Sequence, residues 1–288
     1  MNPDWVWVGS PTQLEAACDS IRRVSLIGVD TEYDSFRYFR EKLCLIQVIS
    51  GGTTYLFDPF KDLDLAPLGD IFADAQILKV LHAGDNDIRI LNRDYGFVFK
   101  NIFDTYRAAS ILGCTYLSLV NVVGVYLGVI LNKTKKMQRS QWENRPLSKE
   151  QLEYAVQDTR YLIALHRVLE EELKRQALEE KAQEVFRGME HIQWREKVLD
   201  PEGYLKIKGT EDLNCEELLR LKALYIWRFE KARTINKARF MIIPDQGLLG
   251  LATIKHASIS ALEESDLLSS QKIRAYGADI IATLAEFD

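Results

Sequence analysis

The stretch Val24-Ser25-Leu26-Ile27-Gly28-Val29-Asp30-Thr31-Glu32 is the segment around which the rest of the chain can be arranged. Its apolar and β-branched residues predict a buried strand over Val24–Thr31. Asp30 and Glu32 stand at the end of this strand. Because they are two residues apart, both side chains leave the same face of the strand. An acid at a strand end is usually a turn or cap residue, so the pair marks a candidate site that further residues must support.

The segments that follow predict a mixed sheet covered by helices. Leu43–Ile49 and Thr53–Phe57 are apolar runs on either side of Gly51-Gly52, which is a strong hairpin signal. Ile77–Leu81 is predicted to be a strand, and Asp85–Tyr95 a helix that ends at a glycine. A hairpin followed by strands that alternate with helices is typical of an α/β fold.

Other elements are predicted from periodicity and from capping residues. The expected elements are a strand at Trp5–Val8, helices at Pro11–Ser20, Asp104–Leu112 and Leu117–Leu127, a polar and basic loop from Asn132 to Arg145, and a long helix at Ser148–Glu172.

The composition is that of an ordinary globular protein. Of the 288 residues, 47% are apolar and 27% are charged, and the net charge is −5. No window approaches the roughly 18 apolar residues of a membrane span. Met1–Ser10 lacks a basic run, so no signal peptide is predicted and a cytoplasmic location is expected. The negative charge argues against a passive coat protein of nucleic acid, but it does not argue against a site that binds divalent metals, because such a site needs carboxylates.

Two further acids and a tyrosine complete the candidate site. Asp87 lies five residues after His82, where a strand is predicted to turn into a helix. Asp158 lies four residues after Tyr154 on the long helix, so the two side chains stack on one face. Taken singly, each acid is typical of a cap or a solvated face, and Asp85 is the natural acid for the first turn of its helix. A histidine at the end of a buried strand is more often packed than functional.

Three segments in chain order together resemble the exonuclease motifs of the DEDD superfamily, in the subgroup with tyrosine in the third motif. Within that subgroup, residues 1–175 are similar to the ribonuclease D group. One departure from the family pattern is Gln141, where the family usually has Asp before Trp142. The three segments are Asp30-Thr31-Glu32, Leu81-His82-Ala83-Gly84-Asp85-Asn86-Asp87-Ile88 and Tyr154-Ala155-Val156-Gln157-Asp158, and Ile102-Phe103-Asp104-Thr105 matches a further family signature.

This resemblance implies a ribonuclease H-like mixed sheet flanked by helices and a two-metal mechanism. By resemblance, Asp30, Glu32, Asp87 and Asp158 hold two divalent ions, Mg²⁺ or Mn²⁺, while Tyr154 orients or deprotonates the attacking water. Crowded carboxylates repel one another without metal, which agrees with a metal site. The implied reaction is hydrolysis of single-stranded RNA from its 3′ end to nucleoside 5′-monophosphates, as in transfer-RNA processing.

The C-terminal part, from Asn214 onward, shows only helical patterns. Residues 211–288 resemble the helicase-and-RNase-D-C-terminal (HRDC) domain, a small helical bundle, and 176–210 are predicted to be a linker helix and loop. A phosphate-binding patch and a packing or protein-contact module both remain open for this domain. The candidate patch consists of Arg228, Lys231, Arg233, Lys237 and Arg239.

Two other functions remain open. A DNA exonuclease would use the same chemistry, because only contacts to the 2′-hydroxyl distinguish RNA from DNA. A catalytically inactive nucleic-acid-binding scaffold is expected to have lost ligands, whereas all four acids and the tyrosine are present. The basic residues Lys133, Lys135, Lys136 and Arg139 form either a phosphate path or a solvated loop.

Overall fold

The computed structural model describes residues 4–131 and 135–287, with only the backbone at 135 and 136. The chain divides into two compact units. The first consists of Met1–Asp34 and Lys42–Arg195, and the second of Ser35–Glu41 and Glu196–Asp288. A seven-residue segment between two strands of the first unit therefore belongs to the second. The functional boundaries at 175 and 210 that the sequence suggests stay a prediction.

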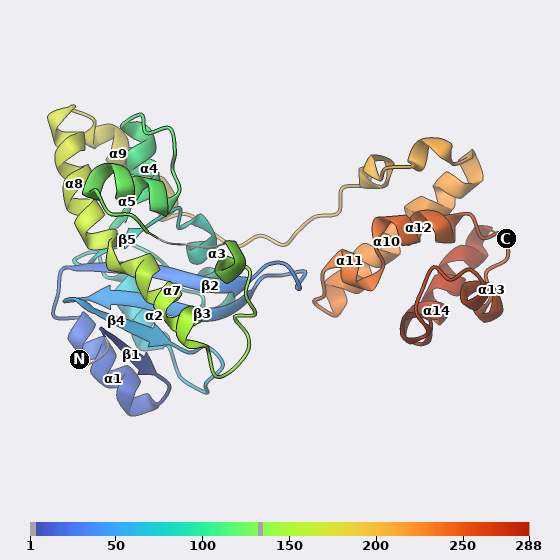
Figure 1. Cartoon of the computed structure of the whole chain (residues 1–288), viewed down its shortest axis with the longest axis horizontal. Coiled ribbons are helices and arrows are strands. Elements are labelled where there is room, and N and C mark those ends of the chain that lie inside the picture. Colours follow the sequence, from blue (N-terminus) through green and yellow to red (C-terminus); the bar gives the residue numbers. More distant parts are fainter. Residues whose placement is uncertain (1–3, 132–134, 288) are drawn as a thin grey trace. The chain divides into compact units, whose positions relative to one another are not determined.

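The first unit is built on a six-stranded mixed sheet (Figure 1). Its spatial order is β1-β4-β3-β2-β5-β6. β2 is antiparallel to β3 and parallel to β5, so it lies at the centre of the sheet with a neighbour on each side. The strands are β1 (Trp5–Val8), β2 (Leu26–Asp34), β3 (Lys42–Ser50), β4 (Thr53–Phe57), β5 (Leu78–Leu81) and β6 (Ile102–Asp104).

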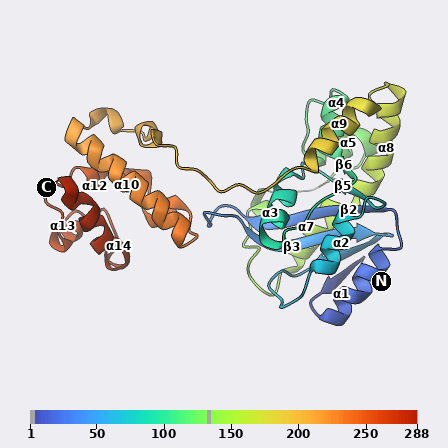
Figure 2. The ribbon, with the colours of Figure 1, turned by 180° about the vertical axis from the view of Figure 1, so that it is seen from behind.

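Helices cover both faces of this sheet, as the two opposite views show (Figures 1 and 2). One face packs against α1 (Pro11–Ile21), α2 (Ala66–Ala73) and α3 (Asp85–Tyr95). The other packs against α4 (Thr105–Ile111), α5 (Leu119–Leu127), α7 (Lys149–Arg160) and α8 (Leu162–Arg175). α6 (Lys135–Gln138) is a single turn before α7, and α9 (Glu179–Met189) packs beside α4 and α8. The predicted ribonuclease H-like α/β fold is confirmed.

Most of the predicted elements are confirmed, with two corrections. The prediction of one long helix at Ser148–Glu172 is wrong, because the chain breaks at Tyr161 into two helices, α7 and α8. The two halves pack into different parts of the core, α7 over β2, β3 and β4 and α8 over β2, β5 and α4, so the chain turns between them. The helix at Asp104–Leu112 is corrected at its start, since Asp104 ends the short strand β6 and caps α4.

The second unit is a helical bundle around its own core. Its helices are α10 (Cys215–Thr234), α11 (Arg239–Ile242), α12 (Asp245–Ala252), α13 (Ile259–Glu264) and α14 (Ser270–Leu284). Asn214 and Glu217 form a reciprocal capping box at the start of α10. Phe39, from the segment between β2 and β3, lies in this core. Its ring packs edge to face against Phe229, with the ring centroids 5.1 Å apart. Across the described parts of both units, no helix has the length and apolar character needed to span a membrane.

Candidate active site

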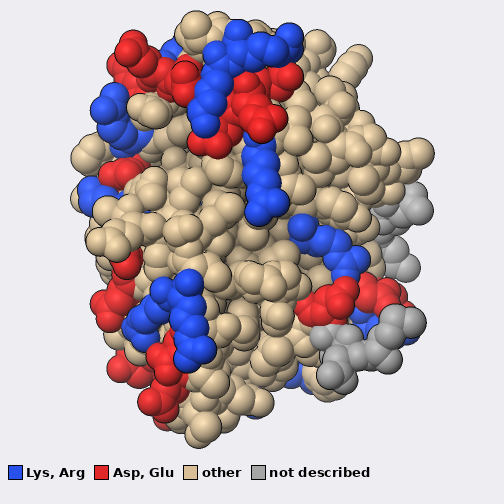
Figure 3. All heavy atoms as spheres, turned by 90° about the vertical axis from the view of Figure 1, so that its left-hand side faces the viewer, with Lys and Arg blue, Asp and Glu red and all other residues tan. Residues whose placement is uncertain are grey.

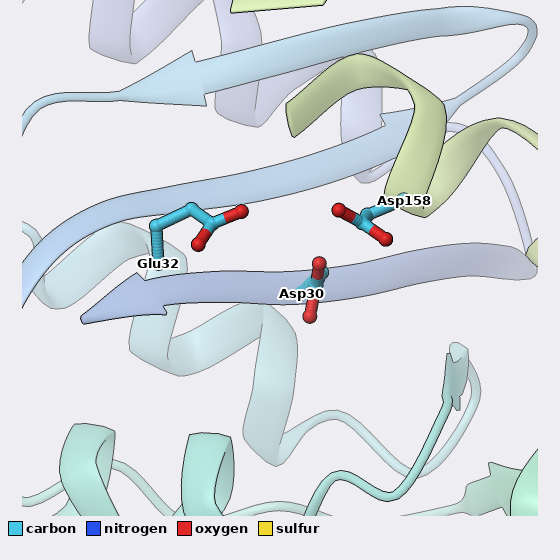
Figure 4. Close-up of side chains that lie close together, drawn as sticks. All are labelled: Asp30, Glu32 and Asp158. Atoms are coloured by element: carbon cyan, nitrogen blue, oxygen red, sulfur yellow. The ribbon is translucent and has the colours of Figure 1, made fainter. Parts of the chain in front are cut away.

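Three of the predicted acids meet between the sheet and α7. Asp30 and Glu32 project from β2, and Asp158 faces them from α7 (Figure 4). One carboxylate oxygen of each lies within 4.8 Å of the others. α7 and the start of α8 approach the sheet closely here, and Gly28 makes this possible. A Cβ at Gly28 would lie 3.1 Å from Leu162 and 2.7 Å from a methyl group of Ile49.

Asp87 lies outside this group of three but is tied to it. It stands in the first turn of α3, is 7% exposed, and accepts a hydrogen bond from the Thr31 hydroxyl. Burial, and then the nearby charge of Asp30, raise the pKa of Asp87 to about 8. Asp85 in the same turn is half-exposed and pairs with Arg107 at 2.5 Å. The two acids of this turn therefore differ: Asp85 forms a surface ion pair, whereas Asp87 is buried beside the carboxylate cluster.

The turn that places Asp87 is held by the next strand and helix. The Gly84 amide donates to Oδ2 of Asp104 at 2.9 Å, and the Thr105 hydroxyl donates to the Leu81 carbonyl at 3.0 Å. Ala83 between them has a left-handed φ of 56°, a conformation that needs such support. The Asp-Thr pair at the end of β6 thus fixes the backbone of the β5–α3 turn. Burial raises the pKa of Asp104 to about 6.

Tyr154 lies one turn before Asp158 and borders the same site. Burial, and then the charges of Glu32 and Asp30, raise the pKa of the Tyr154 hydroxyl above its ordinary value. The hydroxyl therefore stays protonated at neutral pH, which suits a donor that orients a water better than a base. The Trp142 ring packs against Tyr154 with centroids 5.9 Å apart.

The start of α7 is fixed by its own cap and by the preceding loop. Ser148 and Gln151 form a reciprocal capping box, as predicted. The Gln151 side-chain amide also donates to the Ser140 hydroxyl and to the Gln141 carbonyl. Since position 141 supplies a backbone carbonyl here, having Gln rather than Asp at this position leaves the contact in place.

Arg145 anchors the same loop to the sheet, which the sequence alone did not reveal. Its guanidinium donates to both carboxylate oxygens of Asp58, at 2.8 and 3.0 Å, and to the carbonyls of Cys44 and Trp142. Asp58 is fully buried at the end of β4. This bidentate pair therefore fixes the loop whose Trp142 ring packs against Tyr154.

A cavity of about 510 Å³ opens beside the acids. Asp30, Tyr154 and Asp158 line one side, and His82 and Tyr106 line another. The His82 Nδ1 atom lies 2.9 Å from the Thr105 hydroxyl, so the ring is both held by the fold and exposed to the cavity. Tyr106, one residue after the Asp-Thr pair, was not identified from the sequence.

The basic residues give little support to a broad phosphate-binding surface. On the face of the first unit in Figure 3, lysines and arginines of the described chain stand in small groups next to acids. Lys133 lies outside the described residues, as do the side chains of Lys135 and Lys136. In the second unit, Arg228 is buried against Asp245 and the Ile243 carbonyl, so it serves packing, whereas Lys231 and Arg233 form ion pairs with acids and stay partly exposed. Both interpretations of this patch stay predictions.

The donor set suits hard divalent cations, which prefer oxygen ligands. The sheet order, together with carboxylates gathered where a helix crosses the central strand, is the arrangement expected of ribonuclease H-like nucleases that work with divalent metal ions. Residues 5–174 match the family described as 3′-5′ exonuclease, and residues 217–284 match the HRDC domain. The chain belongs to the ribonuclease D family of hydrolytic 3′-5′ exonucleases.

Individual relatives agree with this assignment. Ribonuclease D of Desulfotalea psychrophila is 30% identical over 96% of this chain and 74% of its own length. The crystal structure of Escherichia coli RNase D is 28% identical, with a TM-score of 0.75 over all of this chain and 75% of that one. The catalytic core of RRP6 from Trypanosoma brucei has a TM-score of 0.90 at 24% identity, over 98% of this chain and 79% of that one, and shows the shared fold.

Proposed function

We propose that this protein shortens single-stranded RNA from its 3′ end and releases nucleoside 5′-monophosphates with the help of two divalent ions, Mg²⁺ or Mn²⁺. The observation that carries the proposal is the group of three carboxylates within 4.8 Å beside a cavity of about 510 Å³. The name of the ribonuclease D relatives indicates that they act on RNA. The E. coli structure is described as that of an exoribonuclease involved in structured RNA processing. We include a transfer-RNA precursor among the substrates proposed for this protein.

Each residue of the site has a role in this proposal. Asp30, Glu32, Asp87 and Asp158 would hold the two ions. Bound there, divalent ions supply charge stabilisation and an activated water for phosphodiester hydrolysis. The cavity between Tyr154 and His82 would receive the terminal nucleotide. The protonated Tyr154 hydroxyl would orient the attacking water, and Tyr106 offers an aromatic edge to the nucleotide.

DNA is the second candidate substrate. RNA and DNA differ at the 2′-hydroxyl, and no residue of the described site is assigned to contact that group. An inactive scaffold is disfavoured by the convergence of the acids that the sequence retains. We further propose that residues 1–175 carry catalysis, that 176–210 connect the parts and that 211–288 assist substrate binding. A cytoplasmic location is part of the same proposal.

The test is a degradation time course with 5′-labelled single-stranded RNA and DNA of the same sequence, in Mg²⁺, in Mn²⁺ and in EDTA. The proposal predicts a ladder that shortens one nucleotide at a time from the 3′ end, faster on RNA and absent in EDTA. A faster ladder on DNA would move the assignment to the second candidate. Binding of RNA without any cleavage would support the scaffold instead.

A further inference from the structure

Gln47 is a buried amide without a hydrogen-bond partner among the described residues. It lies in the middle of β3 and is 0% exposed. Neither its side-chain oxygen nor its side-chain nitrogen has a partner. Leaving a buried amide unsatisfied is costly, and such groups need a specific explanation.

The sheet register places Gln47 next to the acid cluster. Gln47 stands opposite Asp30 across the antiparallel β2–β3 ladder. Directly opposed residues share a face, with Cβ atoms about 4.5–5.5 Å apart. Asp30 faces α7 and Asp158, so the Gln47 amide lies in the same layer between the sheet and α7.

The other neighbours in this layer offer Gln47 little to bond with. Leu45 and Ile49 are the adjacent same-face residues of β3, and Leu56 stands opposite Gln47 on β4. Thr54 and Thr159 pair with each other through their hydroxyls at 3.3 Å. Tyr154 brings a neutral hydroxyl to the same layer. The acids are the charged acceptors of this face, and they match the two N–H donors of the amide most strongly.

We propose that Gln47 is a positioning residue for Asp30. Its side-chain amide donates a hydrogen bond to the Asp30 carboxylate when the site holds its divalent ions, and it thereby orients that carboxylate. Hydrogen bonds of this kind to ligating carboxylates set ligand orientation and metal affinity. A neutral amide adds no further charge to a cluster of three acids with Asp87 beside it. The inference rests on the proposed metal-dependent function.

The experiment measures Mn²⁺ binding to the full chain by calorimetry, in wild type, Gln47→Met and Ile49→Met. Methionine has nearly the length of glutamine and no amide. Ile49→Met places the same side chain on the same face of β3, at the position opposite Gly28 rather than Asp30. We expect the Mn²⁺ dissociation constant to rise about 10- to 100-fold in Gln47→Met, and to stay near the wild-type value in Ile49→Met.

Thermal unfolding in EDTA separates positioning from packing. Because Gln47→Met removes an unsatisfied buried amide, its metal-free melting temperature should equal or exceed that of wild type. If both variants bind Mn²⁺ like wild type, Gln47 does not position Asp30 and the inference fails, while the proposed function stands. If wild type itself binds no Mn²⁺, the proposed function fails with it.

A second measurement needs no variant to fold. The side-chain amide protons of Gln47 in the wild-type chain, observed by NMR with ¹⁵N labelling, should shift downfield as Mg²⁺ saturates the site. Resonances that do not move on Mg²⁺ binding would overturn the inference.

Discussion

The Oγ1 hydroxyl of Thr31 donates a hydrogen bond to Oδ1 of Asp87, and it joins the strand that carries Asp30 and Glu32 to the helix that carries the fourth acid. Thr31 lies between the two acids of β2, and its side chain leaves the opposite face of the strand. The segment Asp30-Thr31-Glu32 therefore supplies two acids to the cluster and, through Thr31, also positions Asp87. This contact explains how Asp87, which is outside the group of three, is kept close to Asp30.

Replacing Thr31 tests this contact. Thr31→Val keeps the shape of the side chain and removes the donor, so we expect activity at limiting Mg²⁺ to fall about 10- to 100-fold. Thr31→Ser retains the hydroxyl and should stay near the wild-type rate. The measurement is the Mg²⁺ dependence of RNA degradation for the three proteins. Equal curves for valine and serine would show that the hydroxyl does not matter.

Tyr154 is expected to contribute to turnover through its hydroxyl. Tyr154→Phe keeps the ring against Trp142 and should slow single-turnover cleavage by roughly 10²-fold, because the group that orients the attacking water is lost. Because the pKa of Tyr154 is raised, the wild-type rate should not depend on ionisation of this hydroxyl near neutral pH. A rate in Tyr154→Phe equal to wild type would reduce Tyr154 to a packing residue.

His166 makes the first unit sensitive to acid. It is buried on α8 beside Phe103, and burial lowers the pKa of its imidazole below the ordinary 6.5. Below pH 6.5 the unfolded chain takes up a proton that the folded chain does not, so the unfolding free energy falls as pH decreases. His166→Leu removes this contribution, which cannot exceed about 1.4 kcal/mol per pH unit.

The check is urea unfolding of wild type and His166→Leu between pH 8 and pH 5. The difference between the two free energies should be constant above pH 7 and should shift in favour of the variant below pH 6.5. Parallel curves over the whole range would mean that His166 is not the acid-sensitive group.

Phe39 should be essential to the second unit although it precedes the C-terminal part of that unit by more than 150 residues in sequence. It is 4% exposed in the core around α10, so Phe39→Ala should destabilise this unit by about 3–5 kcal/mol. Phe36→Ala is the control, because Phe36 is 67% exposed and its ring pairs with Phe240, which is itself 44% exposed. Hydrogen exchange of the α10 amides measures both. Equal protection in the two variants would contradict the assignment of Phe39 to this core.

Local patterns explain why much of the fold and site could be predicted. The apolar run before Asp30 and the hairpin at Gly51-Gly52 depend on neighbouring residues, and both glycines adopt the positive φ that such a turn requires. That Tyr154 and Asp158 lie on one face could be predicted from their spacing, because this requires only that the segment is a helix. The roles of these residues in catalysis are still predictions.

Long-range packing explains what could not be predicted. No proline or glycine marks the break at Tyr161, which follows from the separate cores under α7 and α8. Nothing near Phe39 in the sequence indicates that its segment joins the second unit. Gln47 and Arg145 look like ordinary polar residues until the register of β3 and the burial of Asp58 are known.

The most direct test of the metal-dependent exonuclease site compares Asp158→Asn with Asp85→Asn. Both replace one aspartate carboxylate by an amide, but Asp158 belongs to the cluster and Asp85 forms a surface pair with Arg107. In a Mg²⁺ time course on 5′-labelled single-stranded RNA, wild type and Asp85→Asn should produce a ladder shortening from the 3′ end, and Asp158→Asn should leave the RNA intact while keeping the wild-type melting temperature in EDTA. An undiminished ladder from Asp158→Asn would contradict the site proposed here.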